Sequence, residues 1–201
     1  VFRMKVYALQ VLYKAPDGTG KILKTASDLS SFSFFQRGSV QEFMTFTGKL
    51  LVERTAAGSR STVKENEYFC HVHVRADGLS GVTITDGEYQ ARVAFSMLTR
   101  VLDDFNQKTP NWRTITDEKA CSYSGLPEFV ARWQNPRDAD PMTRVQEEVE
   151  ETKIVMHNTI ASVLERGEKL DDLVKKSENL SDQSKMFYTQ ARKMNKCCNY
   201  M

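Results

Sequence analysis

The sequence predicts an α+β fold in which an antiparallel sheet covered by helices precedes one long coiled-coil helix. Short alternating apolar segments, separated by turns such as Asp-Gly, indicate neighbouring antiparallel strands. Apolar residues at helical spacing mark helices among and after these strands. Residues 142–196 contain no proline and one glycine, Gly167, which favours a helix longer than those of ordinary globular domains.

Five segments of the first part have the composition of strands. Residues 5–13 alternate and are rich in Val, Leu and Tyr, and the turn residues 15–20 would lead into a second strand at 21–26. Asp77-Gly78 between two apolar runs predicts a hairpin. The three remaining strands are expected at residues 61–64, 68–75 and 79–85.

Three helices are expected in the same part. Ser39 and Glu42 have the spacing of a capping box, which would begin a helix whose apolar stripe includes Phe43 and Phe46. Gly48 lies inside that helix and weakens it by about 1 kcal/mol relative to alanine. The other two helices are expected at residues 94–105 and 127–133.

The second part begins after a polar hinge at residues 135–140. Residues 4–134 are expected to form one domain, residues 141–196 a coiled-coil segment, and residues 197–201 a separate tail. Steps of three and four alternate along the coiled-coil segment without a slip, which defines its a and d positions. These positions are Met142, Val145, Val149, Thr152, Met156, Thr159, Val163, Arg166, Leu170, Leu173, Ser177, Leu180, Ser184, Phe187, Ala191 and Met194.

Eleven of these sixteen positions are apolar, and small polar residues occupy most of the others. Such a seam holds an isolated dimer poorly and suits a helix that waits for partner helices, although a long solvated helix in a structural coiled coil is an alternative. A buried guanidinium must be hydrogen-bonded, so Arg166 near the middle of the seam would select register and partners. The alternative is that Arg166 reaches the rim of the bundle.

The tail resembles a lipidation signal. The last four residues, Cys-Asn-Tyr-Met from Cys198, fit the C-a-a-X prenylation box, and a terminal Met favours farnesyl. Cys197 is a candidate for a second lipid, which stable anchoring requires because one lipid alone binds membranes marginally. The alternative is a tail with two free thiols. The preceding helix is basic through Lys185, Arg192, Lys193 and Lys196.

The composition argues against several classes of protein. The formal net charge of +2 does not indicate nucleic-acid binding. No run approaches the roughly 18 consecutive apolar residues of a transmembrane helix, and the first residues lack the apolar core of a signal peptide. We therefore expect a chain on the cytosolic side of membranes, whose cysteines have no reason to form disulfides.

No catalytic or metal site is predicted. His71 and His73 would lie on one face of a strand and Cys70 on the other, which does not suit a shared metal ion. Phosphate loops and nucleophile elbows are absent from the sequence. A DNA-binding zipper would need a dense basic region before the heptads, and the arginines there are sparse.

Four stretches and the Cys-Cys-a-a-Met end carry a resemblance to the prenylated longin-domain R-SNAREs, the Ykt-type synaptobrevin homologues. In the coiled-coil segment they are residues 151–159 (ETKIVMHNT) and 164–174 (LERGEKLDDLV). In the domain they are residues 33–37 (SFFQR) and 40–47 (VQEFMTFT). The resemblance implies a longin (profilin-like) fold, a five-stranded antiparallel sheet with one helix on one face and two on the other, followed by the SNARE helix.

The same resemblance implies vesicle and organelle fusion by a four-helix bundle with three glutamine-type SNARE helices, in which Arg166 is the zero-layer residue. It implies a prenyl group on Cys198, after which residues 199–201 are removed, and palmitoyl or a second prenyl on Cys197, with no other cofactor. It implies cycling between the cytoplasm and Golgi, vesicle, endosomal, vacuolar and autophagosomal membranes. Palmitoyl transfer by the longin domain is the alternative activity, although the sequence shows no activated nucleophile.

A closed form of the free protein is also expected. Four apolar residues lie off the a/d seam, Ile154, Val155, Ile160 and Leu164, and exposed apolar residues of this kind are a liability. Phe43 and Phe46 could supply a complementary groove on the domain that holds these residues and so inhibits the segment. The alternative is that both stripes pack only within their own units.

Overall fold

The computed structural model describes residues 4–136 and 154–198 of the chain, with side chains to residue 194. The strands are β1 (Val6–Lys14), β2 (Gly20–Ser27), β3 (Ser59–Glu65), β4 (Tyr68–Val74), β5 (Leu79–Asp86) and β6 (Ile154–His157). The helices in these residues are α1 (Arg37–Arg54), α2 (Ala91–Lys108), α3 (Leu126–Trp133), α5 (Leu170–Lys176) and α6 (Asp182–Cys198). Short 3₁₀ turns are η1 (Trp112–Thr114), η2 (Glu118–Ala120) and η3 (Ile160–Val163).

The strands of the described residues form one sheet in the order β2-β1-β5-β4-β3-β6. The first five pair antiparallel, as predicted, and the Asp77-Gly78 hairpin joins β4 to β5. Gly78 has φ +90°, and a Cβ there would lie 2.4 Å from the carbonyl oxygen of Lys14, so this turn requires glycine. The sixth strand, β6, comes from the C-terminal segment and was not predicted.

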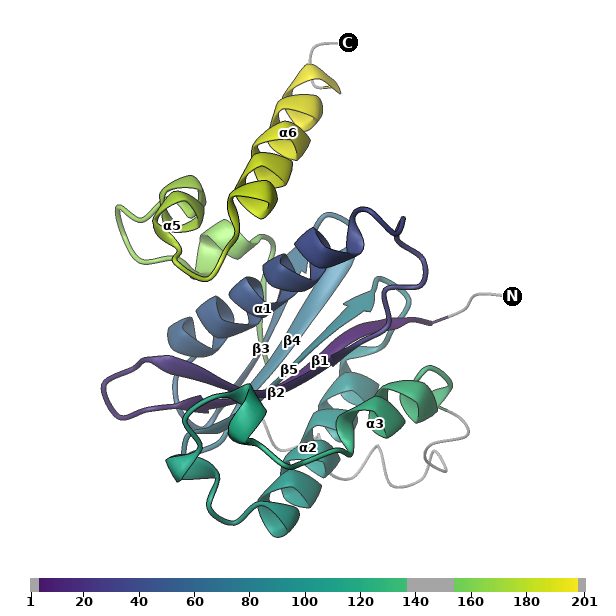
Figure 1. The fold of residues 1–201 in the computed structure, drawn as a ribbon, viewed down its shortest axis with the longest axis vertical. Helices are drawn as coiled ribbons and strands as arrows, with labels where there is room; N and C mark the ends of the chain where they lie inside the picture. Colours follow the sequence, from purple (N-terminus) through teal and green to yellow (C-terminus); the bar gives the residue numbers. More distant parts are fainter. Residues whose placement is uncertain (1–3, 137–153, 199–201) are drawn as a thin grey trace.

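The sheet separates two layers of helices (Figure 1). One core cluster contains buried residues of α1, such as Leu51, together with Val72 and Val82 of the sheet. The other contains the buried faces of α2 and α3, including Phe95 and Trp133. One helix therefore covers one face and two cover the other, which confirms the α+β fold implied by the longin resemblance.

The capping box predicted at Ser39 and Glu42 is wrong. Helix α1 begins at Arg37 with Gln36 at the N-cap, and no side chain caps it. A turn in which the Gln36 N–H donates to the Ser33 carbonyl starts the helix earlier, so Ser39 lies buried inside it. Glu42 is thereby left to contact a distant part of the chain.

Gly48 of α1 lies where β1 passes close beneath the helix. The Gln10 amide nitrogen donates to the Met44 carbonyl oxygen at 2.9 Å, and a Cβ on Gly48 would lie 1.7 Å from the Gln10 side-chain oxygen. Gln10 is only 1% exposed and cannot move aside into solvent. The glycine that appeared unfavourable for the helix therefore permits this close packing.

We expect Gly48→Ala to lower the free energy of unfolding by about 1–3 kcal/mol, because the new methyl group overpacks the Gln10 site. The matched control is Gly38→Ala in the first turn of the same helix, where an added Cβ meets nothing within 4 Å. That change should be neutral or stabilising by up to about 1 kcal/mol. Equal melting curves for the two variants would contradict the packing argument.

His71 is a buried side chain within the sheet. It is 1% exposed, with Nδ1 3.0 Å from the Thr62 hydroxyl and Nε2 3.3 Å from the Thr85 hydroxyl. Burial lowers its pKa to about 4, and burial together with nearby arginines lowers the pKa of His73 to about 4. Both rings are therefore neutral in the folded protein at neutral pH.

Protonation of these two histidines should favour the unfolded chain, because their pKa values are near 6.5 when unfolded. We expect full stability above pH 6.5 and a progressive loss as the pH falls towards about 4. His71→Gln should reduce the fall in melting temperature between pH 7 and pH 5. The fall that remains in this variant would be due to His73. An unchanged slope in the variant would exclude His71 as a source.

The C-terminal helix is present as α6, but it is shorter than the helix expected at residues 141–196. Residues 141–153 lie outside the described residues, and from Ile154 onward the chain forms β6, η3 and α5 before α6 begins. Gly167 has φ +90°, which ends helical geometry between η3 and α5. Several apolar residues of this segment, among them Ile160, Leu170 and Leu173, pack on the domain instead of on a coiled-coil seam.

Candidate functional site

The candidate site is the contact between the C-terminal segment, residues 154–194, and the folded domain. Strand β6 pairs parallel to the edge strand β3, with Arg60 opposite Ile154 and Val63 opposite His157. Edge strands expose unpaired backbone groups, and the pairing with β6 covers part of the exposed edge of β3. Four residues of the heptad segment are therefore extended rather than helical.

Two polar contacts hold the turns that follow β6. The Ile160 N–H donates to the Glu65 carboxylate at 2.8 Å. Arg54, at the end of α1, donates to both carboxylate oxygens of Glu168, at 3.2 and 2.5 Å. The hydrogen bond from Arg54 lowers the pKa of Glu168, so the pair remains ionised at neutral pH. A two-point guanidinium–carboxylate contact also fixes the orientation of the turn.

Helix α6 lies against α1 through an aromatic stack. The rings of Phe43 and Tyr188 are 5.4 Å apart and nearly parallel, at 16°. The Tyr188 hydroxyl donates to Asp171 of α5 at 2.8 Å, and Arg192 also contacts Asp171. These contacts tie α5, α6 and α1 together, so the two C-terminal helices are positioned by the domain.

A second contact between α1 and α6 involves Glu42. The hydroxyls of Ser181 and Ser184 both donate to its carboxylate, the former at 2.7 Å. The hydrogen bond from Ser184 is the largest cause of the lowered pKa of Glu42. Ser184 is a predicted seam residue and is completely buried, and the Glu42 carboxylate of α1 is its hydrogen-bond acceptor.

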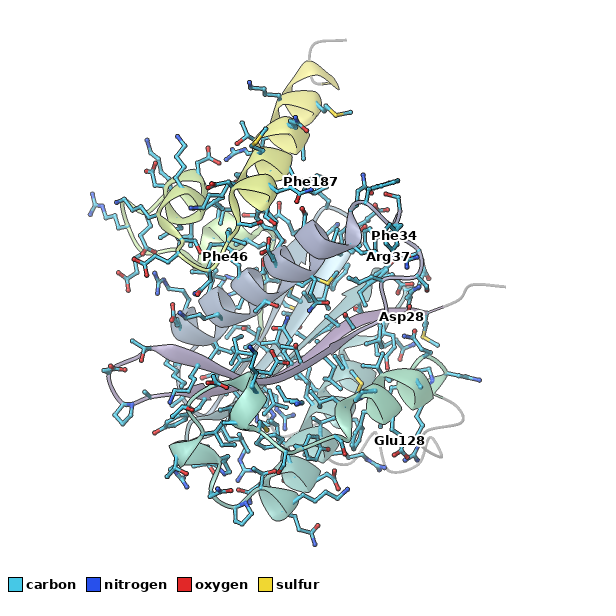
Figure 2. All side chains as sticks on the ribbon, in the orientation of Figure 1. Asp28, Phe34, Arg37, Phe46, Glu128 and Phe187 are labelled. Atoms are coloured by element: carbon cyan, nitrogen blue, oxygen red, sulfur yellow. The ribbon has the colours of Figure 1, made fainter. Side chains whose placement is uncertain are left out.

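A groove of about 740 Å³ opens between the domain and the C-terminal segment, and its lining includes Phe43, Phe46, Ile160, Leu164, Leu170 and Tyr188. Figure 2 shows Phe46 on the side of α1 that faces this segment. Phe46 and Ile160 line this groove together, which agrees with the expected arrangement of these two residues. The expected contacts with Ile154 and Val155 are wrong, because Ile154 packs against the α2 cluster and Val155 is 43% exposed. Successive residues of β6 point to opposite faces of the sheet.

The structure distributes the sixteen predicted seam positions widely. Four of the positions lie outside the described residues: Met142, Val145, Val149 and Thr152. Those that are buried or half-buried are Val163, Leu170, Leu173, Ser177, Leu180, Ser184 and Phe187. Those that are exposed are Met156, Thr159, Arg166, Ala191 and Met194. In this conformation the seam does not form one face.

Arg166 and the two tail cysteines were the most specific candidates. Arg166 is exposed on the turn between Glu165 and Glu168, where the Glu168 N–H donates to the Glu165 carbonyl at 3.0 Å. Cys197 and Cys198 are the last residues of α6. Sequence reasoning missed Glu42, Arg54, Glu65, Glu168 and Tyr188 as contact residues, since their partners are far away in the chain and no periodic pattern links them.

Other kinds of site find no support in the described residues. None of their His, Cys, Asp and Glu side chains gather as a metal site, and none of their helices is long and apolar enough to cross a membrane. Cys70 is buried, and burial raises its pKa to about 12, so it is not an activated nucleophile. Cys121 is buried as well.

The sheet with its two helical layers and the heptad segment folded against it define a longin-domain SNARE protein of the synaptobrevin type. Family models agree: the longin model, described as a regulated-SNARE-like domain, matches residues 29–129, and the synaptobrevin model matches residues 141–200. Membership of the synaptobrevin family implies SNARE partners and a coiled-coil helix.

Individual relatives specify the family further. The chain is 48% identical over 195 residues to "Synaptobrevin homolog ykt6" of Schizosaccharomyces pombe, covering 97% of this chain and 98% of the relative. It is 46% identical to the proteins named "Synaptobrevin homolog YKT6" of Eremothecium gossypii and Yarrowia lipolytica, with the same coverage. The chain belongs to the Ykt6-type synaptobrevin homologues. These names indicate a SNARE protein rather than an enzyme.

Proposed function

We propose that this protein is an R-SNARE that drives fusion of intracellular membranes by forming a four-helix bundle with three glutamine-bearing SNARE helices. The observation that carries the proposal is the heptad seam of sixteen positions with a single arginine, Arg166, in the segment that matches synaptobrevin. Burial of the apolar seam residues would supply most of the free energy of assembly. A buried Arg166 would donate hydrogen bonds to the three glutamine side chains.

We also propose that the folded-back arrangement is an autoinhibited form. Residues 154–157 are a strand of the domain's sheet, and a residue cannot be in this strand and in the bundle helix at once. Leu170 and Leu173, two seam residues, pack against the α1 core cluster. Bundle assembly would require these contacts to break, so their free energy would oppose assembly.

Lipids on Cys198 and Cys197 would anchor the protein to the cytosolic face of Golgi, vesicle, endosomal, vacuolar or autophagosomal membranes. The Cys-Cys-Asn-Tyr-Met end and the basic approach to it support this anchor. Helix α6 would transmit the force of bundle assembly to the lipids at its end. The groove lined by Phe43 and Phe46 has the apolar lining and the volume, about 740 Å³, to shelter a prenyl chain in the soluble form.

Arg166→Gln tests the proposed bundle. We expect the variant to lower the stability of a reconstituted bundle with three glutamine-type helices by about 1–3 kcal/mol, because charge-assisted hydrogen bonds are lost. The free protein should melt as before, since Arg166 is exposed on a turn. Lys176→Gln, which lies off the seam in α5, is the control. Unchanged bundle melting in the Arg166 variant would contradict the zero-layer role.

A further inference from the structure

A basic pocket of about 220 Å³ forms where α5 meets α6. Lys175 of α5 lines it together with Lys185, Arg192 and Lys193 of α6. Among the described residues that line this pocket, Asp171 is the one carboxylate. The pocket therefore combines four cations with a single negative charge, which favours an anionic ligand.

Two of the four cations are held in place by contacts within the protein. Arg192 contacts the Asp171 carboxylate and lies 3.2 Å from the Tyr188 hydroxyl. The Lys185 ammonium donates to the Lys175 carbonyl oxygen at 3.1 Å. Tyr188 is itself fixed by its stack on Phe43. A ligand would thus meet side chains that have already lost part of their conformational freedom.

The charge of Asp171 is already compensated by Arg192, as their ion pair shows. Within the described part of the chain, the ammonium groups of Lys175, Lys185 and Lys193 form no ion pair. Asp171 is the nearest carboxylate to this group and also interacts with the charge of Lys175, so the pocket keeps an excess of positive charge from two helices. A phosphate group suits such a site, since lysine ammonium groups bind phosphate as point charges.

The pocket depends on the folded-back arrangement. Lys175 and Lys185 are ten residues apart, and in one continuous helix they would be separated by about 15 Å along the axis. In the structure, the chain turns between α5 and α6 and brings Lys185 to the Lys175 carbonyl. A bundle-forming helix would not contain this pocket.

Helix α6 has further features of a helix that lies along a membrane surface. Met186 and Met194 are 63% and 70% exposed. Lys193 follows Met186 by seven residues, which places both on one face of the helix. With α6 in the plane of the interface, the methionines would reach the acyl boundary and the lysines would lie at the level of the phosphates.

We propose that the pocket between α5 and α6 binds the phosphate-bearing headgroup of an anionic lipid while the segment is folded back. Headgroup binding goes beyond the proposed fusion activity, because it needs no partner helix. A ligand that binds only one conformation shifts the equilibrium towards it. Anionic lipid would therefore hold the folded-back form at a membrane surface and delay its release into a bundle.

The test uses the full chain without lipid modification and vesicles of phosphatidylcholine with or without phosphatidylinositol bisphosphate. The pocket variant is Lys175→Gln with Lys185→Gln, and the matched control is Lys169→Gln with Lys176→Gln. The control removes the same charge from the same segment at residues that do not line the pocket. We expect the pocket variant to weaken vesicle binding by about tenfold or more and the control by less than about twofold.

Soluble inositol trisphosphate distinguishes the source of the phosphate. A lipid headgroup would be supported if the protein bound the bisphosphate vesicles, if the pocket variant but not the control weakened this binding, and if the soluble compound competed with it. Binding of the soluble compound without binding to the vesicles would overturn the lipid assignment, and equal weakening by both variants would overturn the pocket itself. All four substituted lysines lie off the a/d seam, so bundle assembly, measured separately, reports independently on the proposed fusion activity.

Discussion

Phe46→Glu is expected to release the C-terminal segment from the domain. Phe46 is half-buried and lines the groove beneath that segment with Phe43, to which its ring is 6.3 Å away. Burial of an aromatic side chain contributes roughly 1.5–3 kcal/mol, and Phe46 would lie at the lower end. The ratio of open to closed protein should then rise by about tenfold. Faster proteolysis of residues 154–194 and a larger radius by small-angle scattering would report the opening.

Phe46 also packs against the core cluster of the domain, so opening must be distinguished from unfolding. Ser184→Asp tests the same release from the other side of the contact, because it places a second carboxylate against Glu42 and leaves the domain's own residues unchanged. Gln190→Asp, at an exposed position of α6, adds the same charge as a control. If Phe46→Glu and Ser184→Asp both stayed folded, compact and protease-resistant, the closed-form model would be refuted.

Cys198→Ser is expected to move nearly all of the protein from the membrane fraction to the soluble fraction. The proposed prenyl group attaches to that thiol, and no helix in the described residues could replace it as an anchor. The variant should keep the circular dichroism and melting temperature of the parent, since it replaces one sulfur by oxygen at the last residue of α6.

Cys197→Ser should have an intermediate effect, because it would remove only the second lipid and leave the prenyl group. A single lipid chain binds membranes marginally and reversibly, with a constant of about 10⁴ M⁻¹, so partial and exchangeable binding is expected. Recovery of the Cys198 variant on membranes at the level of the unmodified sequence would exclude the proposed anchor.

Local signals in the sequence predicted the domain well. The hairpin at Asp77-Gly78 and the strands beside it depend on neighbouring residues, and they form as expected. The capping box at Ser39 and Glu42 failed because the helix begins earlier, at Arg37, and Glu42 instead accepts hydrogen bonds from Ser181 and Ser184, 139 and 142 residues away. From the sequence, Gly48 looked unfavourable for its helix. The residue that requires a glycine there is Gln10, which lies on β1, far away in the chain.

The candidate site was predicted less completely. Phe43 and Phe46 line the groove with Ile160, as expected, but the pairing of β6 with β3 could not be anticipated. A heptad pattern describes a helix that packs on other helices. It carries no signal that four of its residues will instead extend along a sheet edge.

The sequence by itself determined the strands, the amphipathic helices, the seam with Arg166 and the Cys-Cys-a-a-Met end, since each is encoded by neighbouring residues or by a period along the chain. Only the tertiary structure decided which surface the heptad segment contacts in the free protein. A period specifies which side chains share one face of an element, whereas the partner of that face depends on residues far away in the chain. Contacts such as Arg54 with Glu168 and Phe43 with Tyr188 exist only after the domain has folded.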